Sequence, residues 1–199
     1  RVDGRIDAAT LDWRATGAEP DYGIDVEFSD LALALGAASR GRDVPGFRGL
    51  SGTARLDPSG GRLTLAGDAA VLSLPGLLEE ADIGLDRYDA LVDWRRDADD
   101  RLSVAIERFG FANADAAGEV SGSWQMAPRG PGRVDLEGWL ERADATRVWR
   151  YLPLRLNAPI RRWVRAAILA GRSRDVRMRL RGDLVDFPFA DAARGEFLV

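Results

Sequence analysis

The sequence contains no cysteine and no histidine, and arginine supplies all 28 of its basic residues. Without cysteine or histidine, the chain cannot form a disulfide, a thiolate or imidazole zinc site, or a serine–histidine catalytic relay. The 28 arginines face 32 acidic residues, so the net charge is -4 and no basic excess exists to attract nucleic acid. These absences exclude most familiar catalytic chemistries and leave paired carboxylates as the one catalytic device that the composition permits. We expect no metal site, no cofactor and no nucleic-acid partner.

The sequence also has no run of 18 apolar residues, the minimum for a membrane-spanning helix. Its 199 residues, of which 46% are hydrophobic, are enough for one sizeable folded unit. Alternating apolar and polar residues reach both ends, at 1–6 and 195–199. We therefore expect one segment of a longer protein, with any membrane anchor outside it.

Apolar residues recur at every second position through most of the chain, which is the pattern of a strand with one buried face. Short clusters of turn-forming residues at 57–61, 96–100 and 127–132 separate these runs and predict hairpins. The prediction is a mainly β fold, a curled antiparallel meander. The apolar positions of the first runs are Leu63, Leu65, Leu72, Leu74, Ile83, Leu85, Val92, Trp94, Leu102, Val104 and Ile106.

The alternation stops at about 144–171, where two short helices are expected. Asp144 can cap the first helix, and Pro153 ends it. The second helix has Asn157 as its N-cap and ends before Gly171. The chain therefore divides into a β-meander at 1–143, a helical insert at 144–171 and returning strands at 172–199.

The second helix of this insert is amphipathic, and its position leaves two roles open. The insert either covers part of the sheet with Val148, Trp149, Ile160 and Val164, or docks a partner through an exposed arginine face formed by Arg161, Arg162 and Arg165. Ordinary solvation of those arginines is the plainer explanation, and contact with anionic headgroups or an acidic partner is the other.

Carboxylates and tryptophans are the remaining chemical signals. Asp97, Asp99 and Asp100 lie in an expected turn, while Asp135 and Glu137 share a polar face with arginines, which indicates charge pairing across strands. The six tryptophans are scattered, at positions where a large apolar side chain fills a core or groove. The apolar face as a whole must be hidden by closure of the sheet, by a second sheet, or by an apolar ligand.

Several sequence elements resemble the YhdP family of AsmA-like proteins, which are long proteins of the bacterial envelope. The more specific elements are Trp149-Arg150-Tyr151-Leu152-Pro153 and the run from Arg179 through Gly182-Asp183-Leu184 to Phe187-Pro188-Phe189. Weaker ones are Pro45-Gly46-Phe47, Leu50-Ser51-Gly52, 61–65 and Phe111-Ala112-Asn113-Ala114-Asp115. The likeness covers most of the chain.

This resemblance implies a periplasmic segment of a repeating β-groove, anchored to the inner membrane by a part outside the segment. It implies that phospholipid acyl chains lie in the groove on their way to the outer membrane, and that the protein is not an enzyme. Combined with the alternation, it predicts these groove-lining residues: Leu63, Leu65, Leu72, Leu74, Ile83, Leu85, Val92, Trp94, Val104 and Ile106.

Two other functions remain open at this point. The segment could be a structural module for outer-membrane biogenesis that contacts envelope proteins by strand addition. Carbohydrate binding or hydrolysis on a β-sandwich is a third, which rests on the carboxylates and tryptophans. An open, continuous apolar face would favour lipid, whereas a closed one with free strand edges would favour protein pairing.

Overall fold

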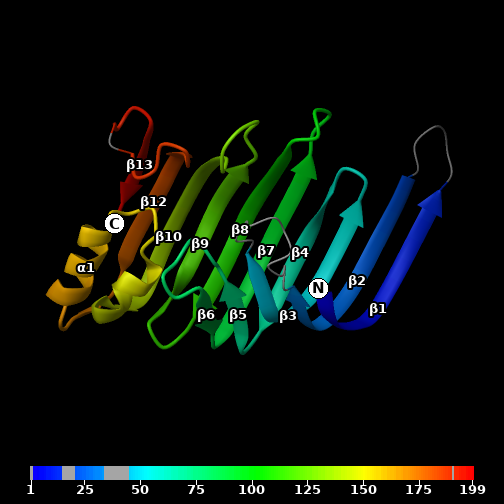
Figure 1. Cartoon of the computed structure of the whole chain (residues 1–199). Helices are drawn as coiled ribbons and strands as arrows, with labels where there is room; N and C mark the ends of the chain where they lie inside the picture. The colour runs from blue at the N-terminus through cyan, green and yellow to red at the C-terminus, as the bar shows by residue number, and fades with distance from the viewer. Residues whose placement is uncertain (1, 15–20, 34–44, 190) are drawn as a thin grey trace.

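The computed structural model describes residues 2–14, 21–33, 45–189 and 191–199, which form one antiparallel sheet (Figure 1). Strands that follow one another in sequence are neighbours in the sheet, so the fold is a meander. β1 and β13 lie at opposite ends of the row, so the sheet is open. In order the strands are β1 (Val2–Arg14), β2 (Asp21–Leu33), β3 (Gly46–Asp57), β4 (Gly60–Gly67), β7 (Arg87–Arg96), β8 (Leu102–Ala112), β9 (Ala116–Gln125), β10 (Arg133–Asp144), β12 (Val176–Asp183) and β13 (Gly195–Leu198).

Three short strands lie off this row. β5 (Ala70–Ser73) pairs with the beginning of β3 and with β6 (Asp82–Leu85), while β11 (Arg172–Ser173) pairs with the end of β10. β4 and β5 are separated by a kink at which Ala69 has a φ of 59°. The sequence pattern over 62–74 is therefore two strands, and Leu74 lies just beyond the second.

Strand register places the apolar residues of successive strands opposite one another. Directly paired residues point to the same side of a sheet, so each set of partners forms a row across it. We call the side that carries these apolar rows the apolar face. Its central row runs through Ala9, Val26, Ala54, Leu63, Val92, Ile106, Gly122, Leu136, Leu180 and Phe197.

The adjacent row, one residue further along each strand, points to the opposite side, the polar face. This row has no large apolar side chain: Thr10, Asp25, Arg55, Arg62, Asp93, Ala105, Ser123, Asp135, Arg181 and Glu196. One such alternation on every strand gives one sheet with two chemically distinct sides. The predicted fold class, a mainly antiparallel β meander, is confirmed.

The buried core lies where the β5–β6 hairpin meets β3, β4 and β7. It consists of Phe28, Leu50, Leu65, Ala70, Leu85, Tyr88 and Ala90. The Tyr88 hydroxyl donates a hydrogen bond to Gly49 O at 2.9 Å and accepts one from Ser51 N at 2.8 Å, so its buried oxygen is satisfied. A Cβ on Gly67 would lie 2.6 Å from that oxygen, so glycine is needed there.

The predicted two-helix insert is also present. It comprises a 3-10 helix, η1 (Ala145–Tyr151), and an α-helix, α1 (Ala158–Ala167). Asp144 caps η1 by accepting a hydrogen bond from Thr146 N at 2.9 Å, as predicted. α1 ends earlier than expected: Ile168 is its C-cap and has extended backbone, so Gly171 lies beyond the helix end.

Candidate functional site

Five of the predicted groove-lining residues lie together on the apolar face. Leu63, Val92 and Ile106 are successive members of the central row. Trp94 and Val104 pair with each other in the next row, which continues through Trp124 and Val134. All five predicted side chains are half-buried, which leaves part of their apolar surface accessible on this side of the sheet, although Leu63 and Val92 also pack against the buried core.

The other five predicted residues lie in or near the buried core. Leu65 and Leu85 are only 8% and 3% exposed, so protein atoms cover them. Leu72 and Ile83 pair with each other across the β5–β6 hairpin and pack against the same core. Leu74 is half-buried in the loop that follows β5. The apolar face is therefore closed beside β5 and β6 and open beyond them.

The structure extends the apolar face to strands that the predicted set omitted. Leu136, Leu180 and Phe197 continue the central row over β10, β12 and β13. Their alternation is visible in the sequence, so this signal was available. The positions of Ala9 and Ala54 carried no such signal, because alanine occurs on both sides of a sheet.

The apolar face has a hollow near the turn that joins β3 to β4. A hollow of about 350 Å³ there is lined by apolar and aromatic side chains together with Asp57 and Arg96. Gly61 makes room for the Trp94 ring, since a Cβ at that position would lie 2.4 Å from Trp94 Cζ2. The apolar contributors are Tyr22, Ile24, Leu56, Pro58 and Trp94.

Ion pairs across strands cover the polar face. Arg62 donates two hydrogen bonds to Asp93, at 2.8 and 2.9 Å, and also contacts Glu107 at 3.0 Å. Hydrogen bonding from Arg62 lowers the pKa of the Asp93 carboxyl below its ordinary value. Between β10 and β12, Arg179 contacts Asp135 and Glu137, which confirms the predicted cross-strand charge pairing. This side of the sheet is chemically suited to water, not to acyl chains.

A buried polar network joins the β8–β9 turn to η1 and to the loop before β6. Asn113 accepts hydrogen bonds from the backbone of Asp115 and Ala116, and its amide donates to Gly84 O and to the Tyr151 hydroxyl, both at 3.1 Å. Arg150 bonds to Asp115 and also donates to Glu80 Oε2 at 2.6 Å. Burial, the largest cause, raises the pKa of the Tyr151 hydroxyl. The periodicity of the sequence gave no sign of this network.

The contacts of α1 match neither prediction for the insert in full. Arg161 and Arg165 contact Glu79 in the β5–β6 loop, at 3.1 and 3.4 Å, and Arg165 also lies over the Trp149 ring. The apolar side chains of the helix are divided: Ile160 is 51% exposed and Trp163 66%, whereas Val164 is half-buried. Arg161 and Arg165 thus find an acidic partner within the chain, because Glu79 lies beside them, whereas Arg162 is exposed.

Comparison with known proteins gives one finding. The family model described as YhdP protein matches residues 2–199. No curated protein and no solved structure matches the chain. In the part of the chain that the structure describes, no helix has both the length and the apolar character needed to cross a membrane. The match covers nearly the whole chain, and this chain therefore belongs to the YhdP family of AsmA-like bacterial envelope proteins.

Proposed function

We propose that this chain is a periplasmic segment of a protein anchored in the inner membrane, and that its apolar face holds phospholipid acyl chains during transport to the outer membrane. The observation that carries the proposal is the open central row of apolar side chains across the sheet. The proposal involves no chemical reaction and no cofactor.

The dimensions of the sheet fit this role. Neighbouring strands lie about 4.8 Å apart, so a row from β1 to β13 extends roughly 43 Å along the sheet. One acyl chain occupies half of a hydrocarbon core about 30 Å thick, or roughly 15 Å. A chain lying along the row would therefore meet apolar side chains over most of its length, with a gap at Gly122.

The energy at stake is large. Each methylene exposed to water costs about 0.8 kcal/mol, so a chain of fifteen carbons costs on the order of 12 kcal/mol to transfer through the aqueous periplasm without cover. Half-buried residues such as Val92 and Ile106 offer surface that would remove much of this cost.

Photo-crosslinking in the bacterial envelope tests the proposal. Probes at Val104 and Ala105 are adjacent in sequence but lie on opposite faces of β8, which makes them a matched pair. We expect phospholipid adducts at Val104 and none at Ala105. A third probe at Leu85 should give none either, because that side chain is in the closed core. A folded protein without adducts at Val104 would overturn the proposal.

A second candidate function, assembly through protein contacts, is favoured by β1. This strand pairs only with β2 in the described part of the chain, and its residues from Val2 to Arg14 are all exposed. An edge strand of this length can pair with a further strand, from the longer protein or from another protein. Thr10→Pro would hinder such pairing. Loss of function with unchanged lipid adducts at Val104 would favour assembly.

A further inference from the structure

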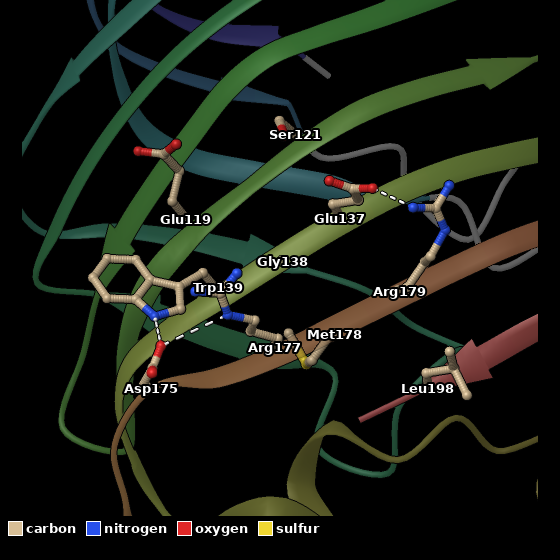
Figure 2. A pocket seen from close by; sticks show the side chains of 10 residues that line it. All are labelled: Glu119, Ser121, Glu137, Gly138, Trp139, Asp175, Arg177, Met178, Arg179 and Leu198. Atoms are coloured by element: carbon tan, nitrogen blue, oxygen red, sulfur yellow. Dashed lines mark hydrogen bonds and ion pairs between the residues drawn. The ribbon is translucent and has the colours of Figure 1, made fainter.

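A hollow of about 640 Å³ lies on the polar face, over β9, β10 and β12 (Figure 2). Strand register builds it from two adjacent rows. Glu119, Trp139 and Arg177 form the first row, and Ser121, Glu137, Arg179 and Leu198 form the second. Its volume is in the range of ligand sites, about 300–1,000 Å³. It lies on the opposite side of the sheet from the apolar face.

Trp139 is the unusual residue of this hollow. Its side chain is 46% exposed on a face that otherwise carries mainly polar groups. The indole Nε1 donates a hydrogen bond of 2.6 Å to Asp175 Oδ1, which fixes the ring (Figure 2). An exposed indole with its one donor already satisfied presents its flat apolar surface, and little else, to a ligand.

The charged groups around the ring balance one another. Glu137 pairs with Arg179, and Asp175 lies 3.9 Å from Arg177. Glu119 pairs with Arg108 at 3.1 Å. No single sign of charge dominates, so the hollow offers fixed hydrogen-bond donors and acceptors without a field that selects an ion. A neutral ligand rich in both donors and acceptors matches this surface.

We propose that this hollow binds a neutral oligosaccharide that carries N-acetyl groups, with one pyranose ring stacked on Trp139. The C–H groups on the face of a pyranose carry slight positive charge, which complements the negative face of an indole. Hydroxyl and acetamido groups at the ring edge would bond with the surrounding carboxylates and guanidinium groups. The exposed Leu198 at the other side of the hollow supplies an apolar contact for the acetamido methyl.

A second hollow indicates an extended ligand. It has a volume of about 370 Å³, shares Glu119 and Trp139 with the first, and continues over β7 and β8 through Asp89 and Arg108. Trp139 therefore stands between two neighbouring depressions. An oligosaccharide would occupy both, with the ring stacked on Trp139 at the centre, whereas a single sugar would use only one.

Two other ligand classes fit less well. A quaternary ammonium group is held by a cage of several aromatic rings, and among the residues lining this hollow Trp139 is the one aromatic side chain. A phosphate group requires a site with excess positive charge, but the residues that line this hollow include three carboxylates against the two guanidinium groups of Arg177 and Arg179.

Binding of the N-acetylglucosamine tetramer to the intact chain tests this proposal. Isothermal titration calorimetry should show saturable binding, and the Trp139 indole N–H resonance, identified by its absence in Trp139→Phe, should shift during titration. Trp139→Ala should weaken binding roughly tenfold or more, because aromatic side chains dominate binding energy at such sites. Trp139→Phe, which retains a flat ring, should bind with intermediate affinity.

The matched control is Trp163→Ala, which removes a tryptophan on α1 that is more exposed than Trp139 and lies outside both hollows. This variant should bind like the unmodified chain. The circular dichroism spectrum shows whether each variant is folded. Failure of the unmodified chain to bind at 10 mM tetramer, or equal binding by folded Trp139→Ala, would overturn the proposal. Neither result bears on lipid adducts at Val104, which lies on the other face.

Discussion

The Tyr151 hydroxyl donates a hydrogen bond to Asp115 Oδ2 at 3.1 Å and so links η1 to the turn between β8 and β9. Asp115 is only 7% exposed and also bonds to Arg150, which in turn reaches Glu80. These contacts join segments more than thirty residues apart, and they hold the insert at one end of the sheet by polar bonds. η1 and α1 themselves contain no buried residue.

Asp115→Ala should therefore destabilise the chain markedly. The substitution removes one partner from both Arg150 and Tyr151 in a partly buried site, and breaking a buried pair by removing one member typically costs about 3–5 kcal/mol. Because Arg150 retains Glu80 and is itself partly exposed, we expect the lower part of that range. Urea unfolding measures the change in the free energy of unfolding.

Asp99→Ala is the control for this prediction, because Asp99 is an exposed turn residue paired with Arg101. Exposed pairs contribute little, so the change should be less than about 1 kcal/mol. Similar losses in the two variants would show that the network does not stabilise the fold.

The sheet was predictable from the sequence because one rule governs it. The alternation at Val104 and Ile106, repeated on most strands and separated by hairpin turns, indicates a meander with one apolar side, and register then aligns the rows. The closed core was not predictable. Leu65 and Leu85 carry the same alternation as Val92, and only the fold of the β5–β6 hairpin against the sheet separates buried positions from open ones.

The insert shows the other limit of sequence reasoning. The amphipathic pattern of α1 identified a helix with two faces but not which face contacts the protein. Glu79, eighty-two residues before Arg161, decides this by pairing with the arginines. Likewise, Trp139 forms its hollow only because register sets it between Glu119 and Arg177. Long-range partners of this kind leave no periodic signal.

Gly67→Ala should destabilise the core. Its new Cβ would lie 2.6 Å from the Tyr88 hydroxyl oxygen, which is held between Gly49 O and Ser51 N and cannot move freely. Overpacking of this kind costs about 1–3 kcal/mol. Gly84→Ala is the matched control, because no atom lies within 4 Å of a Cβ added there. Equal unfolding free energies for the two variants would contradict the tight packing around Tyr88.

Stability should fall as the pH is lowered below about 4. An aspartate in the unfolded chain titrates near pH 3.9, and in the folded chain the pKa of Asp93 lies lower, mainly because Arg62 donates a hydrogen bond to it. The folded state therefore binds fewer protons in this range, and the stabilisation present above pH 4 is lost as the pH falls through the folded pKa.

Urea unfolding between pH 7 and pH 2.5 measures this dependence. Asp93→Asn should make the curve shallower, whereas Asp99→Asn, in the exposed turn, serves as the control. An unchanged curve for Asp93→Asn would show that its ion pair with Arg62 is not a source of the acid sensitivity.

The last prediction concerns the apolar face and compares neighbouring residues of β8. Val104→Asp places a carboxylate where an acyl chain would lie, and covering an unpaired charge with hydrocarbon costs several kcal/mol. Lipid adducts at a photo-crosslinking probe on Val92, in the central row of the same apolar face, should therefore fall severalfold. Ala105→Asp adds the same charge on the polar face and should leave the adducts unchanged. Because both positions are at least partly exposed, each variant should remain folded, which urea unfolding verifies. Equal loss of adducts in both variants would mean that charge anywhere on β8 acts on the whole sheet, and undiminished adducts in Val104→Asp would mean that lipid does not lie on this face.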